Sequence, residues 1–270
     1  MLGTVVGVLC CQKSADPTLT RTGLNILSIM LIVSWNCGGA LRNKFSALED
    51  LLPEVSIVQE CEDPSRSASG EYRKWASNHL WVGDNKNRGL GVFAKPHISI
   101  EPDELQSDGL QTFLPCRIQR SVLLIGVWTR QTESYDYRYI GQLWKYLQLH
   151  KAALEANTSL VMGDLNSNVI WDRRHSVAKH SDVVRELANI GLESAYHRVR
   201  SVPQGKEPDP TFFLQRDLKK PYHIDYAFIP AAWLQSCTVE IGDSTHWLKY
   251  SDHMPLRVEV DDATWRLTRR

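Results

Sequence analysis

The sequence predicts an α/β protein in which helices pack against β-sheets in layers. Short apolar runs typical of buried strands alternate with segments whose apolar residues recur at helical spacing. No linker rich in Pro, Gly or Ser interrupts this alternation between residues 28 and 262. The length of 270 residues suits one large domain with its own core. We therefore predict a single domain over residues 28–262.

The two ends of the chain are predicted to lie outside this domain. Residues 1–27 are expected to be an extension, and residues 263–270 a C-terminal tail. Met1 to Cys11 is apolar, but it lacks the basic start and the small-residue cleavage site of a signal peptide. Met30 lies at the beginning of the first strong strand, so it is a second candidate for the true start.

The first half of the domain begins with strand, helix and strand. The apolar run 29–35 is typical of a buried strand. Apolar residues three and four apart predict a helix over 42–52, which Pro53 ends. A second apolar run predicts a strand at 55–59, and the polar, Ser-rich stretch 62–88 is expected to be a surface loop with some helix near 72–77.

The second half continues the alternation. Apolar runs predict strands at 90–94 and 121–128, and a helix with one apolar face follows at 137–156. A short strand at 160–162 stops at Gly163. The remaining elements are a helix at 183–190 capped by Gly191, a loop at 201–210, and strands at 224–229, 238–241 and 256–260.

Composition excludes several function classes. Lys+Arg and Asp+Glu are both 31, so the net charge of zero argues against a general coat for nucleic acid. The six cysteines show no zinc spacing, and their scatter favours a reducing, cytoplasmic setting. The longest apolar stretch, Leu24 to Val33, is too short for a membrane span. Neither a nucleophile elbow nor a phosphate-binding loop is present.

Polar residues occur at the ends of several predicted strands. The strand ends of one sheet can meet at a single rim, where these side chains would lie together. Their amide and carboxylate oxygens suit a hard divalent cation such as Mg²⁺ or Mn²⁺. The residues concerned are Asn36, Glu60, Asp164, Asn166, Asp225, Asp252 and His253.

These residues lie in motifs that resemble, in order, the motif series of the endonuclease/exonuclease/phosphatase superfamily, which includes DNase I and exonuclease III. The resemblance spans residues 35–253. It implies a four-layered α/β sandwich with two packed, mostly antiparallel sheets, the DNase I-like fold. The motifs are Trp35-Asn36, Gln59-Glu60, Gly163-Asp164-Leu165-Asn166, His223-Ile224-Asp225-Tyr226 and Ser251-Asp252-His253.

The resemblance also implies a role for each residue. Glu60 would be the principal ligand of Mg²⁺ or Mn²⁺, with Asn36 and Asp252 helping to hold the metal. Asp164 would orient or deprotonate the attacking water, and Asn166 would hydrogen-bond the phosphate. In the same way, His253 would contact the scissile phosphate, and Asp225 would fix the orientation of that imidazole.

The sequence departs from the family pattern at two places. Gly38 stands where some exonuclease III-like members carry an Asp, which implies a leaner metal shell. Trp128-Thr129-Arg130 stands where members often place a His or Tyr, so Arg130 or Thr129 could supply that phosphate contact. Further candidate substrate contacts on predicted site loops are Trp171, Arg173 and Arg174.

The predicted function is divalent-metal-dependent hydrolysis of phosphodiester bonds, with DNA or RNA as the substrate. Two alternatives remain open. One is a phosphoesterase on a small molecule or lipid head group, like a sphingomyelinase. The other is a catalytically inactive binding module on the same fold. The sequence leaves endonuclease against exonuclease action open, and also the oligomeric state.

Overall fold

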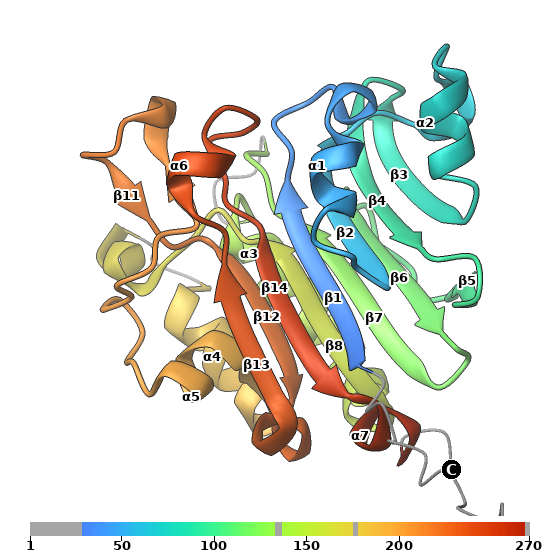
Figure 1. The fold of residues 1–270 in the computed structure, drawn as a ribbon. Helices are drawn as coiled ribbons and strands as arrows, with labels where there is room; N and C mark the ends of the chain where they lie inside the picture. Colours follow the sequence, from blue (N-terminus) through green and yellow to red (C-terminus); the bar gives the residue numbers. More distant parts are fainter. Residues whose placement is uncertain (1–28, 133–136, 175–177, 268–270) are drawn as a thin grey trace, which may run out of the picture.

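The computed structural model describes residues 29–132, 137–174 and 178–267, so the predicted extension 1–27 lies outside the described residues. Two six-stranded sheets pack face to face, and helices cover the outer face of each sheet (Figure 1). The layers are therefore helix, sheet, sheet and helix. This arrangement confirms the predicted four-layered α/β sandwich.

The first sheet holds both chain-terminal strands of the described domain. Strands β1 and β2 run parallel, and every other neighbouring pair in this sheet is antiparallel. The order is β13 (Cys237–Ile241), β14 (Leu256–Asp261), β1 (Ile29–Asn36), β2 (Val55–Cys61), β4 (Arg88–Ala94) and β3 (His79–Asn85).

The second sheet repeats this pattern, with β7 and β8 as its single parallel pair. Strand β8 packs across the core against β1 of the first sheet. The carboxyl ends of β1 and β8 therefore meet at one end of the sandwich. The order is β5 (Ile100–Pro102), β6 (Phe113–Ile118), β7 (Val122–Trp128), β8 (Thr158–Asp164), β12 (Asp225–Pro230) and β9 (Leu192–Ser194).

Three apolar clusters hold the layers together. One fills the space between the two sheets, another joins the first sheet to its helices, and the third joins the second sheet to its helices. Both faces of the central strands are thus covered, which explains why these strands are continuous apolar runs in the sequence. The helices are α1 (Phe45–Glu49), α2 (Gly70–Trp75) and α6 (Ser244–Trp247) on the first sheet, and α3 (Ile140–Glu155) and α4 (His180–Asn189) on the second.

The structure differs from the expected elements mainly at the edges of the sheets. Residues 62–88, expected to be a loop, include the edge strand β3, which is half-buried and lacks a strong apolar pattern. The helix expected over 42–52 is a 3-10 turn, Leu41–Asn43, followed by the short α1. The sequence also did not predict several further elements: strands β5, β6 and β9, helices α5 (Ala195–Arg200) and α6, and a small hairpin of β10 (Phe212–Phe213) and β11 (Pro221–Tyr222).

The C-terminal tail expected at 263–270 is helical in its first half. Residues Asp262–Leu267 form α7, which packs at the end of β14 and β1. Trp265 is fully buried, and its ring lies 5.2 Å from that of Trp233. Burial of so large an apolar surface holds this helix on the domain. In the described part of the chain, no helix has the length and hydrophobicity of a membrane span.

Candidate active site

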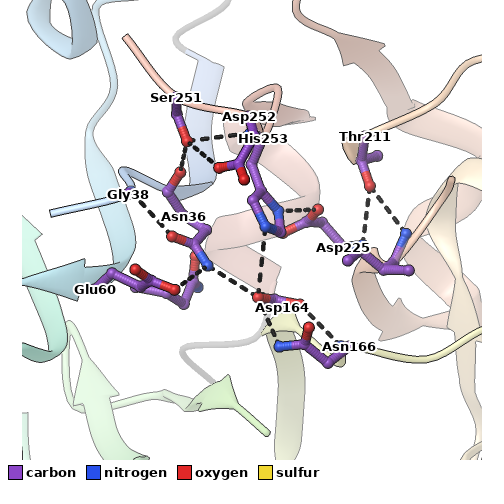
Figure 2. A network of polar contacts seen from close by, with 12 residues as sticks. Asn36, Gly38, Glu60, Asp164, Asn166, Thr211, Asp225, Ser251, Asp252 and His253 are labelled. Atoms are coloured by element: carbon purple, nitrogen blue, oxygen red, sulfur yellow. Dashed lines mark hydrogen bonds and ion pairs between the residues drawn. The ribbon is translucent and has the colours of Figure 1, made fainter. Parts of the chain in front are cut away.

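Seven polar residues gather where strands of the two sheets end (Figure 2). Asn36 and Glu60 come from β1 and β2 of the first sheet, and Asp164 and Asp225 from β8 and β12 of the second. Residues 251–253 reach the same place from the loop before β14. The structure thus brings together all seven residues proposed from the sequence as catalytic or metal-binding. The complete set is Asn36, Glu60, Asp164, Asn166, Asp225, Asp252 and His253.

Asn36 joins the two sheets at this site. Its Nδ2 donates to Oε1 of Glu60 at 3.3 Å and to Oδ2 of Asp164 at 3.0 Å. Its Oδ1 accepts the backbone N–H of Gly38 at 3.0 Å, which fixes the amide in this orientation. Glu60 has a left-handed φ of 60° and lies in a β-bulge of β2, which turns its side chain toward Asn36. The amide therefore holds the two carboxylates in a set position.

Asp164 lies at the centre of the site and is fully buried. Its Oδ1 accepts the backbone N–H of Asn166 at 2.8 Å, and its Oδ2 accepts Nδ2 of Asn166 at 3.0 Å. The residue before it, Gly163, has φ +154°, and a Cβ there would lie 1.8 Å from O of Val127. Only glycine therefore fits at the point where β8 delivers the carboxylate.

His253 and Asp225 form a buried pair beside Asp164. Nδ1 of His253 lies 2.9 Å from Oδ2 of Asp225, which is the hydrogen bond expected from the sequence. Nε2 of the same imidazole lies 3.9 Å from Oδ2 of Asp164. Thr211 anchors Asp225, because its Oγ1 accepts the backbone N–H groups of Ile224 and Asp225 at 2.9 and 3.0 Å. The imidazole thus lies between two carboxylates.

The segment that carries His253 is tied to the end of β1. Oγ of Ser251 donates to O of Asn36 at 2.7 Å and accepts the backbone N–H of His253 at 3.1 Å. The indole Nε1 of Trp35 donates to O of His253 at 3.0 Å. Trp35 and Ser251 are both fully buried. These contacts fix the imidazole relative to Asn36, although the two residues are far apart in the sequence.

Burial and neighbouring charges shift the ionisation of this group. Burial, together with the nearby Asp225, raises the pKa of Asp164 to about 7, although His253 and the hydrogen bond from Asn36 act in the opposite sense. For His253, burial favours the neutral form, but Asp225 and Asp164 outweigh it and raise the pKa to about 9. Without a metal, the imidazole of His253 therefore favours its protonated form. The neighbouring carboxylate of Asp164 readily accepts a proton.

The oxygen-rich donor set fits a hard divalent cation. Atoms of Asp164, Asp225 and His253 lie within 4.8 Å of one another, and Oδ1 of Asp225 has no hydrogen-bond partner among the described residues. Since His253 is hydrogen-bonded to Asp225 and favours its protonated form, we regard these three as the proton-handling group. Glu60 and Asp252, the less buried carboxylates of the group, stay the predicted candidates for holding a cation.

Gly38 lies close to Ser251 and Asp252, and its φ of +62° is a left-handed conformation that favours glycine. A Cβ at Gly38 would lie 3.3 Å from Oγ of Ser251 and 3.7 Å from Oδ1 of Asp252. An acidic side chain at this position would therefore point toward Asp252. The leaner metal shell that the sequence implies stays a prediction.

The candidate substrate residues lie around the site rather than in it. Arg130 has its guanidinium 4.9 Å from the ring centroid of Trp128, and it is held by Asp84 at 2.7 Å and Gln111 at 2.6 Å. Trp171 is half-buried in a 3-10 segment, Val169–Arg174, after the Asp164 loop. Arg173 is exposed there, and the side chain of Arg174 lies outside the described residues.

Four further residues contact the seven site residues, either directly or through one neighbouring side chain, and the sequence did not predict them. Arg88 forms an ion pair with Glu60 at 2.8 Å, and Thr211 anchors Asp225. The ring of Phe212 lies 4.5 Å from that of His253, and Tyr222 is its partner in the β10–β11 pair. A single Arg, Thr or aromatic residue belongs to no recognisable sequence motif, so the sequence alone could not identify these four residues.

Comparisons with known proteins agree with this geometry. The family model described as "Endonuclease/Exonuclease/phosphatase family" matches residues 33–253. No curated protein sequence matches the chain. Similar solved structures include an AP endonuclease from Archaeoglobus fulgidus (TM-score 0.61, 18% identity, covering 86% of this chain and 99% of that one). Another is the 3'-5' exonuclease NExo from Neisseria meningitidis (TM-score 0.64, 18% identity, covering 86% and 100%).

A third similar structure is a variant of the 3' phosphatase NExo from Neisseria bound to a product DNA hairpin (TM-score 0.63, 17% identity, covering 86% and 99%). At these identities the structural similarity shows a shared fold. The family model spans most of the chain and includes both Asn36, near its start, and His253, at its end. The chain therefore belongs to the endonuclease/exonuclease/phosphatase family.

Proposed function

We propose that the protein is a divalent-metal-dependent phosphodiesterase whose substrate is a nucleic acid. The observation that carries this proposal is the convergence of Glu60, Asp164 and the Asp225–His253 pair on one site. Hydrolysis of a phosphodiester needs an oriented water, neutralisation of phosphate charge and stabilisation of the leaving oxygen. The residues of this site can meet the first two needs directly.

The proposed roles follow from the position of each group. Asp164 takes the proton from the attacking water, because burial makes its carboxylate a better base than an exposed one. His253 is oriented by Asp225 and offers an N–H at Nε2 to a phosphate oxygen. Nδ2 of Asn166 donates to Oδ2 of Asp164 and to O of Thr129, so it reaches the same phosphate by exchanging one of these two partners. Glu60 and Asp252, helped by Asn36, would hold Mg²⁺ or Mn²⁺, and a bound cation would neutralise phosphate charge and stabilise the leaving oxygen.

A row of aromatic rings favours a nucleic acid over a small phosphodiester. From His253 the row runs through Phe212 to Tyr222, whose ring centroids are 6.4 Å apart, and on to Trp171 at 5.3 Å from Tyr222. Phe212, Tyr222 and Trp171 are each partly exposed. Bases stack on such rings without regard to sequence. The solved relatives include an AP endonuclease and a structure bound to product DNA, which supports the same proposal.

A cleavage assay tests the proposal. The purified protein is incubated with Mg²⁺ and supercoiled plasmid, and separately with end-labelled single- and double-stranded DNA and RNA oligomers. We expect cleavage that an Asp164→Asn variant lacks, and the product pattern then separates nicking from end digestion. Absence of cleavage by a protein that still binds Mg²⁺ would contradict a nuclease and favour a small-molecule or lipid phosphodiester.

Metal binding is tested separately by thermal unfolding with and without Mg²⁺ or Mn²⁺. We expect the cation to raise the melting temperature of the wild type, and Glu60→Gln to reduce that shift. Glu71→Gln, at an exposed position in α2, is the matched control and should keep the full shift. A wild type that shows no shift would favour an inactive binding module on the same fold.

A further inference from the structure

Arg88 forms an ion pair with Glu60, whose carboxylate we propose as the principal metal ligand. Its guanidinium lies 2.8 Å from Oε1 of Glu60, the same oxygen that accepts Nδ2 of Asn36. In the described part of the chain, Glu60 is the only carboxylate within ion-pair distance of Arg88. A divalent cation bound to that oxygen would place like charges side by side. Arg88 and the cation therefore compete for Glu60.

Once a cation displaces Arg88 from Glu60, the arginine side chain still has a second contact, the ring of Trp128. Arg88 is the first residue of β4, and its side chain is 56% exposed, so the guanidinium is free to move. Its carbon Cζ lies 5.2 Å from the ring centroid of Trp128, which anchors the side chain independently of Glu60. Arg130 contacts the same ring but is held by Asp84 and Gln111. Of these two arginines, Arg88 is the one that can exchange partners.

The same contact places Arg88 at the edge of the proposed catalytic centre. Trp128 is the last residue of β7, and it is directly aligned with Asp164 on β8. Glu60 belongs to the opposite sheet. The side chain of Arg88 thus extends from the metal side of the site to the side that carries Asp164. A guanidinium released here meets the negative charge of a bound phosphate, for which its planar fork is well suited.

We infer that Arg88 is a substrate-phosphate contact that neutralises Glu60 until a divalent cation takes its place. This inference rests on the proposed function. The cation releases the guanidinium, and the released guanidinium holds the phosphate, so the two ligands favour each other's binding. Because binding free energies are linked, bound phosphate also strengthens cation binding by the same factor.

Mn²⁺ titration by calorimetry tests the competition without any activity measurement. Arg88→Ala removes the competitor, so we expect the dissociation constant for Mn²⁺ to fall at least about threefold. Arg130→Gln is the matched control, since it removes a positive charge from the same tryptophan without touching Glu60, and it should change the constant much less. Unchanged or weaker Mn²⁺ binding in Arg88→Ala, or equal effects in both variants, would overturn the inference.

The coupling is measured with a fluorescein-labelled DNA dodecamer in an Asp164→Asn background, which keeps the oligomer intact. With Arg88 present, Mn²⁺ should tighten DNA binding about fivefold or more, within the usual range for linked sites. The Arg88→Ala protein should lose most of this gain, Arg88→Lys should keep part of it, and Arg120→Ala, at an exposed position in the β6–β7 turn, should keep all of it. Full coupling without Arg88 would overturn the phosphate contact.

The two proposals fail in different ways. A protein that binds Mn²⁺ but not the dodecamer would contradict the nucleic acid substrate, and the Mn²⁺ titration of Arg88→Ala would still decide the competition. A protein that cleaves DNA but shows no change in Mn²⁺ affinity in Arg88→Ala would keep the proposed function and overturn this inference.

Discussion

Nδ1 of His253 lies 2.9 Å from Oδ2 of Asp225, and the two side chains are only 6% and 1% exposed. The second oxygen of Asp225 makes no hydrogen bond among the described residues. Among the described residues, the only hydrogen bond of this carboxylate is therefore the one with the imidazole. We expect this pair to govern the orientation and the charge of His253 during turnover.

Asp225→Asn tests that dependence. The amide keeps the shape of the carboxylate but removes its charge, so the imidazole loses the group that orients and charges it. We expect kcat to fall roughly 10²- to 10⁴-fold, the range usual for general acid–base groups, and the melting temperature to fall as well, because a buried imidazole loses its charged partner. Steady-state kinetics with the substrate identified in the cleavage assay compares kcat of the variant with that of the wild type. Asp50→Asn, at an exposed position, is the control, and an Asp225→Asn enzyme with full kcat would contradict the role.

Thr211→Val tests the support of Asp225. The hydroxyl of Thr211 accepts two buried backbone N–H groups, and valine has a similar shape but no acceptor. We expect the free energy of unfolding to drop by roughly 2–4 kcal/mol, because both N–H groups lose their partner. Thr211→Ser keeps the acceptor and should recover most of this loss. Urea unfolding of the three proteins compares them, and equal stability of the valine and serine variants would exclude the proposed support.

Gly163→Ala tests the close approach of β8 to β7. The added Cβ would lie 1.8 Å from a backbone oxygen of Val127, and φ at this residue is +154°. We expect a loss of about 3 kcal/mol or more, or failure to fold, since a backbone strand has to move. Gly70→Ala is the control, because no atom lies within 4 Å of a Cβ there. A Gly163→Ala protein with native melting temperature would show that this approach is not required.

Glu207→Gln should change how stability depends on pH. Glu207 is only 6% exposed and lies 2.9 Å from Nε2 of His197. Burial alone would raise its pKa, but hydrogen bonds from His197 and the backbone of Gly205 lower it to about 2. Since an unfolded Glu titrates near 4.3, the folded state gains stability above that pH and loses it as the pH falls toward 2.

The size of this effect is at most about 3 kcal/mol, from the difference between the two pKa values. Urea unfolding between pH 2.5 and 7 measures it. The gap between wild type and Glu207→Gln should be largest near neutral pH and should close in acid. Glu101→Gln, whose side chain is 47% exposed, should follow the wild type throughout. A gap that stays constant with pH would contradict the depressed pKa of Glu207.

Most of the central strands, and the polar residues that gather at their ends, were predicted from the sequence. Buried strands such as β1 and β7 are continuous apolar runs because both faces are covered, and apolar periodicity marked the long helix α3. Edge elements gave no such pattern: β3 is half-buried, and α7 is held chiefly by burial of Trp265. Their structure depends on what they pack against.

The sequence by itself determined the fold class and the seven polar residues, because apolar runs and the polar residues that end them are local features of the chain. Only the tertiary structure decided that Asn36 bonds both Glu60 and Asp164, that Thr211 anchors Asp225, and that Arg88 pairs with Glu60. These contacts join residues from different strands and from both sheets. Their distances depend on how the sheets pack and on the bulge at Glu60, which no local pattern specifies.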